Sequence, residues 1–380
     1  MIGRSIALVG MLAATVGGCQ GAAGPPPLYL GHVANRSGPD SSGRQAEQGI
    51  RLALKTLKDA NFAESLQGRE LEARHTDTKG QLDAFESEAV RLVAVNRVIG
   101  LLGGTTPEEV ARLDRGHVPV LALAGVRPPG VSDMVFAAGM RPRQQAYVLA
   151  KYAADELDLA DVLVLVDERR EDFVAAADSF GKDFAQERKP KVKGPPVLPV
   201  PVRFGKDANW EELAKMITSR KSARAVLFAG KSRDWVELRR RMPASPLLLF
   251  AGDDADAAGL QAAPGKQVVY LATTFAPDRN SSREQAFVQK YREAFKDDPD
   301  VSAALAYECL QLLADALKQA SPTFAPDKTR DALRQIKDFP GLAGALTITE
   351  DQYIRRPLFM ARLDSAGLTR LKRYEPEMLP

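Results

Sequence analysis

Cysteine, histidine and aromatic residues are all scarce in this sequence of 380 residues, and each scarcity excludes a class of protein. The three histidines, His32, His75 and His117, lie too far apart for the short spacings of zinc ligands, so we expect no metal site. Aromatic residues make up 7% of the chain, and no basic stripe with interleaved aromatics occurs. This composition argues against a partner made of nucleic acid.

The motifs of several large enzyme classes are missing as well. The chain contains no Gly-x-Gly-x-x-Gly, no Gly-x-x-x-x-Gly-Lys-Ser/Thr, no Gly-x-Ser-x-Gly and no His-Glu-x-x-His. Dinucleotide binding, nucleoside triphosphate binding, serine hydrolysis and zinc peptidase chemistry therefore have no support in the sequence. We expect a protein that is not an enzyme and that carries no cofactor.

The charges are balanced and mixed along the chain, with 52 Lys and Arg residues against 49 Asp and Glu residues. Hydrophobic residues make up 45%, as in ordinary globular proteins. At about 150 residues per domain, the length predicts two or three domains, each able to bury a substantial core.

The amino terminus has the features of a bacterial export signal. Arg4 precedes an apolar run from Ile6 to Val16, which is shorter than the about 20 residues of a membrane-spanning helix. Val16-Gly17-Gly18-Cys19 resembles the lipobox of bacterial lipoproteins. This resemblance implies that residues 1–18 are removed, that Cys19 is lipidated and anchors the protein to a membrane, and that residues 19–27 form a tether. A simple secretory signal with an incidental cysteine is the alternative.

The other cysteine, Cys309, lies in the apolar helical pattern AALAYECLQLLADAL. We therefore expect it to be buried in a core. Once Cys19 is lipidated, the chain has no second thiol with which Cys309 could form an internal disulfide.

From residue 28 onward, short apolar runs of strand length alternate with amphipathic stretches of helix length. This alternation is typical of βα units around parallel sheets and predicts two α/β lobes. The expected strands span 28–34, 71–75, 98–102, 118–124, 162–166, 197–203, 225–229, 247–251, 268–273, 346–348 and 358–363. The expected helices span 45–58, 83–95, 107–115, 143–157, 172–187, 210–219, 234–242, 283–295, 302–319 and 327–336. The late helices lack strands of their own, so we expect them to pack on the two lobes.

Several segments carry a family resemblance through their order and spacing. They are LGHVANRSGPDSSGRQAEQGIRLAL, VIGLLGGTTPEEV, VPVLALAGV, VFAAGMRPRQQAYVLAKYA, AVLFAGKSRDWVELRRRM, LLLFAGDDADAAGL, VVYLATTFAPD, AALAYECLQLLADALKQA and DALRQIKDFPGLAGALTI. Over residues 28–365 the chain resembles the periplasmic leucine/isoleucine/valine-binding proteins, the type I substrate-binding component of branched-chain amino acid ABC transporters.

The resemblance implies a type I periplasmic-binding-protein fold of two doubly wound α/β lobes joined by three crossovers. Lobe 1 is expected to comprise residues 28–142 and 276–345, and lobe 2 residues 143–275 and 346–380. The crossovers are expected near Arg141–Gln144, Thr274–Asp278 and Gly344–Thr349. A ligand is trapped between the lobes when a hinge motion closes them.

The resemblance also implies a ligand site. The ligand carboxylate would be bound in lobe 1 by Gly104, Thr105 and Thr106 of one turn and by Ala124 and Val126 of a second. Its ammonium would meet Asp254, with Asp253 as the alternative, and Lys231 would line the wall formed by lobe 2.

The chain also departs from the family pattern at this site. Val126 stands where the family has a hydroxyl, the first turn has glycines where serines are common, and the loop DERREDF puts Asp172 or Phe173 near the usual aromatic.

Two functions remain open. In the first, a lipid-anchored, monomeric solute-binding protein of the cell envelope delivers a small, amino-acid-like polar ligand to an ABC permease of the inner membrane. In the second, an envelope lipoprotein of the same fold binds a protein partner, as activators of peptidoglycan synthesis do, and has no small-molecule ligand. The first is the leading hypothesis, and the departures at the expected site support the second as its alternative.

Overall fold

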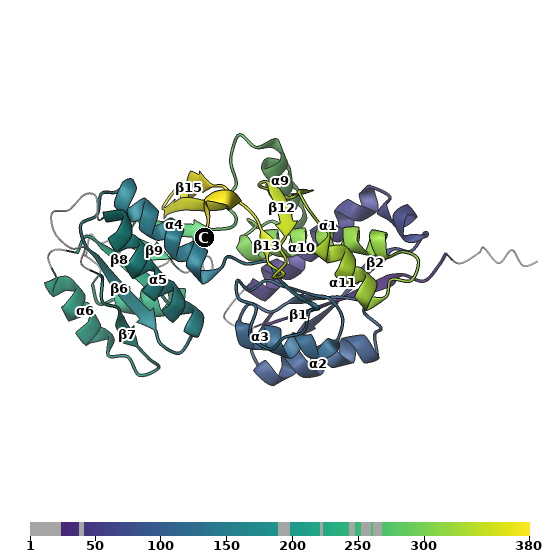
Figure 1. Cartoon of the computed structure of the whole chain (residues 1–380), viewed down its shortest axis with the longest axis horizontal. Helices are drawn as coiled ribbons and strands as arrows, with labels where there is room; N and C mark the ends of the chain where they lie inside the picture. Colours follow the sequence, from purple (N-terminus) through teal and green to yellow (C-terminus); the bar gives the residue numbers. More distant parts are fainter. Residues whose placement is uncertain are drawn as a thin grey trace, which may run out of the picture.

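Two open sheets and the helices that cover them organise the chain into the two lobes seen in Figure 1. The computed structural model describes residues 24–37, 42–188, 198–220, 223–242, 248–251, 260 and 268–380. The two α/β lobes predicted from the alternation of strands and helices are confirmed. None of the helices described has the length and apolar character needed to cross a lipid bilayer.

The first sheet contains five parallel strands in the order β2-β1-β3-β4-β5. They are β1 (Leu28–Ala34), β2 (Leu71–Asp77), β3 (Leu101–Gly103), β4 (Val120–Ala122) and β5 (Val135–Ala137). One face packs on α2 (Leu82–Ala94), α3 (Pro107–Leu113) and the 3₁₀ turn η2 (Asp114–Gly116). The other packs on α1 (Ser42–Asp59), the 3₁₀ turn η1 (Phe62–Leu66) and helices from later in the chain. Apolar residues on both faces of these strands are buried because helices cover both.

The second sheet repeats this order. Its parallel strands are β6 (Val162–Asp167), β7 (Val202–Phe204), β8 (Ala225–Ala229), β9 (Leu248–Ala251) and β10 (Val269–Thr273). They run β7-β6-β8-β9-β10, and the antiparallel strands β14 (Leu358–Asp364) and β15 (Gly367–Tyr374) extend the sheet beyond β10. Two separate apolar clusters cover its faces, one with α4 (Pro142–Asp155) and α5 (Glu171–Arg188), the other with α6 (Trp210–Ser219) and α7 (Ser232–Arg239).

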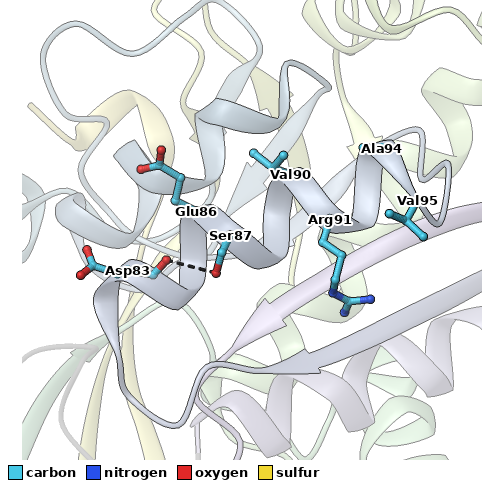
Figure 2. Close-up of a pocket in the computed structure, with 7 residues that line it drawn as sticks. All are labelled: Asp83, Glu86, Ser87, Val90, Arg91, Ala94 and Val95. Carbon is cyan, nitrogen blue, oxygen red and sulfur yellow. Dashed lines mark hydrogen bonds between the residues drawn. The ribbon is translucent and has the colours of Figure 1, made fainter.

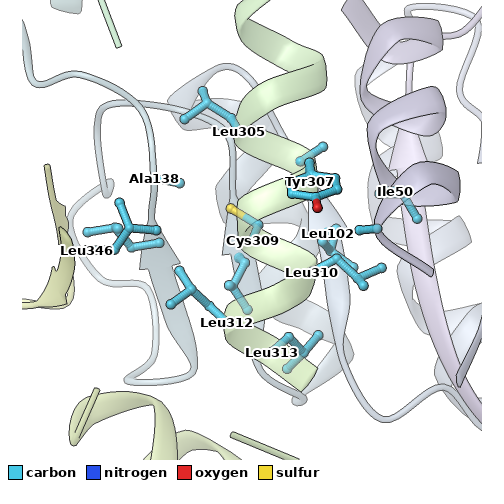
Figure 3. Packing of buried hydrophobic residues seen from close by; sticks show 14 of the residues in the cluster. Ile50, Leu102, Ala138, Leu305, Tyr307, Cys309, Leu310, Leu312, Leu313 and Leu346 are labelled. Carbon is cyan, nitrogen blue, oxygen red and sulfur yellow. The ribbon is translucent and has the colours of Figure 1, made fainter. Parts of the chain in front are cut away.

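The late helices pack on the first lobe. α9 (Ser282–Phe295), α10 (Val301–Ala320) and α11 (Pro326–Arg334) contribute apolar residues to the same core as Leu30 and Leu102 of the first sheet. Figure 3 shows α10 at the centre of this core, with Leu310 and Leu313 facing neighbouring elements. Cys309 on this helix is 0% exposed, which confirms its predicted burial, and burial raises the pKa of its thiol to about 12.

One predicted boundary is wrong. Residues from 346 onward were expected in lobe 2 and the third crossover at Gly344–Thr349. Instead, β12 (Ala345–Ile348) pairs with β11 (Phe339–Pro340) and β13 (Ile354–Arg355) in a small antiparallel sheet. Leu346, Ile348 and Ile354 lie in the core of lobe 1 because this sheet turns back onto it, and a backbone bridge joins Ala137 to Tyr353. The chain reaches the second sheet only at Leu358, and it ends after the 3₁₀ turn η4 (Pro376–Met378).

A histidine pair, with His32 buried and His75 half-buried, joins β1 to β2. His32 lies opposite His75 in the parallel register, and their Nδ1 atoms are 3.1 Å apart, so one ring donates a hydrogen bond to the other. Burial lowers the pKa of His32 well below its ordinary value of 6.5, and the neighbouring His75 lowers it further. Burial also lowers the pKa of His75, to about 4. The folded protein therefore keeps both rings neutral at pH values where the unfolded chain protonates them.

We expect the free energy of unfolding to fall as the pH is lowered from about 6.5 to about 4, because in this window the unfolded state binds protons that the folded state excludes. Each histidine contributes a slope of up to about 1.4 kcal/mol per pH unit. Urea unfolding at several pH values measures the slope, which His75→Gln should reduce. His117→Gln, at an exposed position, is the control. Equal slopes in the two variants would contradict this role of the pair.

Candidate functional site

The carboxyl ends of the parallel strands mark the candidate site in each lobe. In open sheets with this strand order, ligands bind outside these ends where the order reverses, here between β1 and β3 and between β6 and β8. The turn after β3 contains Gly104, Thr105 and Thr106, and the turn after β8 contains Lys231. In the view of Figure 1, α3, which follows the first of these turns, lies on the side of lobe 1 nearest lobe 2.

Packing explains the two glycines of the first turn. Gly103 has a φ of 135°, and a Cβ added to it would lie 2.1 Å from the carbonyl oxygen of Val33 on β1. Gly104 has a φ of 73°, which L side chains rarely adopt, and lies against Val110 and Leu113 of α3. Both glycines are therefore required by the turn itself, whether or not a ligand binds.

A carboxylate of the protein occupies the donors that the sequence assigned to a ligand carboxylate. Oε2 of Glu109 accepts hydrogen bonds from the Thr105 amide at 2.7 Å, the Thr105 hydroxyl at 3.0 Å and the Thr106 amide at 3.3 Å. The Glu109 amide in turn donates to the Thr106 hydroxyl at 3.3 Å. Together these bonds form a capping box at the start of α3. A ligand carboxylate at this turn would have to displace that of Glu109.

The second turn of lobe 1 is joined to the first. The Ala124 amide donates to the Gly104 carbonyl oxygen at 3.0 Å, so the structure brings the two predicted turns together but leaves this amide occupied. Val126 is half-buried and offers no hydroxyl, as its sequence implies. The amide of the next residue, Arg127, donates to the Tyr353 hydroxyl at 3.3 Å.

The first crossover supports this second turn from behind. The Gly139 amide donates to the Ala124 carbonyl oxygen at 3.0 Å. A Cβ added to Gly125 would lie 1.8 Å from the Met140 carbonyl oxygen, so the turn and the crossover are in direct backbone contact. A movement of this turn must therefore displace the backbone at the first crossover.

Lobe 2 presents a charged cluster that the sequence analysis did not identify. Asp167, at the end of β6, is 2% exposed, and its two carboxylate oxygens accept hydrogen bonds from the Arg169 guanidinium at 2.7 and 2.6 Å. Burial alone would raise the pKa of Asp167, but the bonds from Arg169 hold it below its ordinary value. Arg169 also lies 3.2 Å from Asp234 in the first turn of α7, where burial raises the pKa of the Asp234 carboxyl.

Lys231 precedes α7 as its N-cap residue and is half-buried, three positions before Asp234 of this cluster, and its role on the wall of lobe 2 stays a prediction. The sequence signal for the cluster was a run of charges in Asp167-Glu168-Arg169-Arg170 directly after a buried strand. Asp253 and Asp254, proposed for the ligand ammonium, and Cys19, proposed for lipidation, lie outside the described residues.

The first aromatic residue after β6 in the sequence belongs to the core. Phe173 is buried on α5, and the Arg170 guanidinium covers its ring at 4.0 Å from the centroid. The narrow cavity beside it, bounded also by Phe228 and Gly230, has a volume of about 10 Å³, little more than a water molecule requires. This cavity cannot hold an amino acid as it stands.

A larger depression lies on the outer face of α2. It is lined by residues of that single helix and its C-cap, among them Glu86, Val90 and Arg91 (Figure 2). It is open to solvent and is lined by this one helix and its C-cap, so it brings no groups of the two lobes together. Within the described part of the chain, no cluster of three or more His, Cys, Asp or Glu side chains is arranged to bind a metal.

We expect Thr106→Ala to lower the free energy of unfolding by about 1 kcal/mol, because it removes the hydroxyl that caps α3. Thr106→Ser keeps the hydroxyl and is the matched control. Urea unfolding at neutral pH compares the two variants with the wild type. The cap would not contribute to stability if Ala and Ser at this position gave the same free energy of unfolding.

Comparisons with known proteins agree with this architecture. A family model described as periplasmic binding protein matches residues 27–368. The crystal structure of the leucine binding protein LivK from Thermotoga maritima superposes with a TM-score of 0.76 at 20% identity, covering 93% of this chain and 100% of that one. LivJ from Streptococcus pneumoniae, in complex with isoleucine, gives a TM-score of 0.76 at 19% identity, with 91% and 100% covered.

A solute binding protein from Rhodopseudomonas palustris, in complex with 3,4-dihydroxybenzoic acid, gives a TM-score of 0.73 at 16% identity and covers 92% of this chain and 98% of that one. A search of curated protein sequences found no match. The predicted type I periplasmic-binding-protein fold is confirmed by the strand order and by these superpositions. The chain belongs to the periplasmic binding protein family, whose members work outside the cytoplasm.

Proposed function

We propose that this protein is a non-enzymatic, monomeric solute-binding protein of an ABC importer, which captures a small ligand between its lobes and delivers it to a permease of the inner membrane. The observation that carries the proposal is that one chain builds two sheets of the same strand order and crosses between them three times. This arrangement places two ligand-binding edges on bodies that can rotate about the crossovers.

The ligand class follows from the polar groups at these edges. LivJ holds isoleucine, and two structures of similar fold from Rhodopseudomonas palustris hold 3,4-dihydroxybenzoic acid and benzoate. Each of these compounds is small and carries one carboxylate. We infer an amino-acid-like or related carboxylate ligand that exchanges with Glu109 at the amides of Thr105 and Thr106, and that faces Lys231 and the Asp167–Arg169–Asp234 cluster in lobe 2. Asp254, or alternatively Asp253, remains the candidate for a ligand ammonium.

A thermal-shift screen of the whole chain carrying Cys19→Ser tests this proposal with amino acids, benzoates, amides, polyamines and sugars. A ligand at 100 times its dissociation constant adds about 2.7 kcal/mol to the stability. For a carboxylate that binds, we expect Glu109→Gln to tighten binding about tenfold, because the neutral amide competes less for the Thr105 and Thr106 donors. Glu108→Gln, on the exposed side of the same turn, is the matched control.

Two results would count against this mode of binding. If Glu109→Gln and Glu108→Gln bind the same carboxylate with equal affinity, the ligand does not use the amides of this turn. If no compound of the panel stabilises the wild type or either variant, importer function loses its support.

We also infer that Cys19 carries the lipid that anchors the protein. We expect the wild type to fractionate with membranes and to be released by detergent, because two or three acyl chains bind a bilayer almost irreversibly. Cys19→Ser should fractionate with the soluble envelope proteins, and Cys309→Ser, which changes a buried thiol, should stay with the membranes. A wild type that is soluble after export would instead indicate a simple secretory signal.

A second candidate is supported by the contacts of Glu109. Because this carboxylate already occupies the donors of the first turn, the fold could serve as an envelope lipoprotein that binds a protein partner, such as an enzyme of peptidoglycan synthesis. If no compound of the ligand panel stabilises either the wild type or Glu109→Gln, this function is favoured over transport.

A further inference from the structure

The carboxyl-terminal hairpin β14–β15 has an irregularity that redirects its arginine side chains. Met360 pairs with Lys372 and Ala361 with Arg370, so Leu371 has no residue opposite it. A bulge of this kind interrupts the alternation of faces along a strand. As a result Arg370 and Arg373, three positions apart, both lie over the ring of Phe359, at 3.8 and 5.9 Å from its centroid.

Arg370 connects the second sheet to the second crossover and to lobe 1. Its Nη2 atom lies 2.5 Å from Oε2 of Glu284 on α9, and its Nε donates to the Ala276 carbonyl oxygen at 2.6 Å. Glu284 is 2% exposed and also accepts the Asp278 amide at 2.9 Å. The ion pair is therefore shielded from solvent, and both of its partners are bonded to the segment that links β10 to α9.

Arg373 makes a second connection, at the third crossover. Its Nη1 donates to the Ala343 carbonyl oxygen at 2.6 Å in the loop of lobe 1 that precedes β12. Gly344 has a φ of 154°, and a Cβ added to it would lie 2.8 Å from Pro357 and 2.9 Å from Nη2 of Arg373. Pro357 links β13 to β14, so this arginine lies directly against the chain where it passes between the lobes.

We propose that Arg370 and Arg373, on this bulged strand, form a clamp that holds the two lobes in one relative orientation and sets how readily they close. In Figure 1 the hairpin lies between the body of lobe 2 and the α9 and β12 elements of lobe 1. Hinge motion must be absorbed at the crossovers, and both arginines bind there. Parting Arg370 from Glu284 would leave a buried carboxylate without its cation, which costs far more than breaking an exposed pair. The clamp regulates the closure on which the proposed function depends.

The test measures the distance between the lobes in the ligand-free protein. Spin labels are attached to Ser87→Cys, on the exposed face of α2 seen in Figure 2, and to Lys215→Cys on α6, in the whole chain carrying Cys19→Ser. Cys309 is buried and its raised pKa keeps the thiol unreactive, so it stays in place. Pulsed electron paramagnetic resonance then gives the distribution of distances.

The double variant Arg370→Met with Glu284→Gln removes both charges, keeps the apolar stem over Phe359, and leaves an acceptor for the Asp278 amide. We expect a second distance population to appear, with its ratio to the first raised about tenfold over the wild type, the effect of one charged hydrogen bond. The matched control is Lys372→Met with Glu156→Gln, a pair on the same strand whose partner lies at the end of α4 within lobe 2. The control should give the same distribution of distances as the wild type.

The clamp is refuted if the double variant has the distance distribution of the wild type, or if the control changes it equally. Should the double variant fail to fold, Arg373→Met removes the second connection without leaving a buried charge and must raise the second distance population over that of the wild type. These measurements use no ligand. A failed ligand screen would therefore remove the support for importer function without affecting the clamp, whereas unchanged distances would refute the clamp alone.

Discussion

Both faces of a parallel sheet must be covered by helices, and this requirement organises the whole chain. The first sheet has α2 and α3 on one face, but its other face needs α10 beside α1, and α10 follows the parallel strands of the second sheet in the sequence. Gly49 of α1 lies so close to α10 that an added Cβ would be 2.1 Å from the Ala303 carbonyl oxygen. The chain must therefore return to the first lobe. The crossovers between the lobes result from that return.

Elements with a strong hydrophobic period were predictable from the sequence, and elements defined by their tertiary partners were not. The apolar run at residues 162–166 predicted β6, and the apolar helical pattern at residues 302–319 predicted α10. Both sets of bounds agree with the structure within about one residue. β15 (GLTRLKRY) contains three basic residues and lies at a sheet edge, and only its pairing with β14 makes it a strand. The third crossover was misplaced because nothing in residues 345–355 shows on which lobe the small sheet docks.

The candidate site illustrates a different limit of sequence reading. Thr106-Pro107-Glu108-Glu109 carries the capping-box signal, yet the same residues after a strand suit an anion-binding turn, and the local pattern is identical for both. In lobe 2 the same ambiguity holds for Asp167 and Arg169, which neutralise each other across two residues. At both places the described polar groups bond to one another, so in the proposed binding mode a ligand exchanges one set of hydrogen bonds for another. Selectivity would then depend on how well a ligand replaces the internal partners.

The burial of Cys309 has a consequence for the life of the protein outside the cytoplasm. Thiolates react with the oxidants and disulfides of that compartment, but the folded chain holds this thiol in α10 with a pKa of about 12 and no exposed surface. The same residue is accessible while the exported chain is still unfolded. The interval between translocation and the docking of α10 onto the first sheet is therefore the period in which oxidation could trap the protein, and rapid completion of the first lobe is what ends that risk.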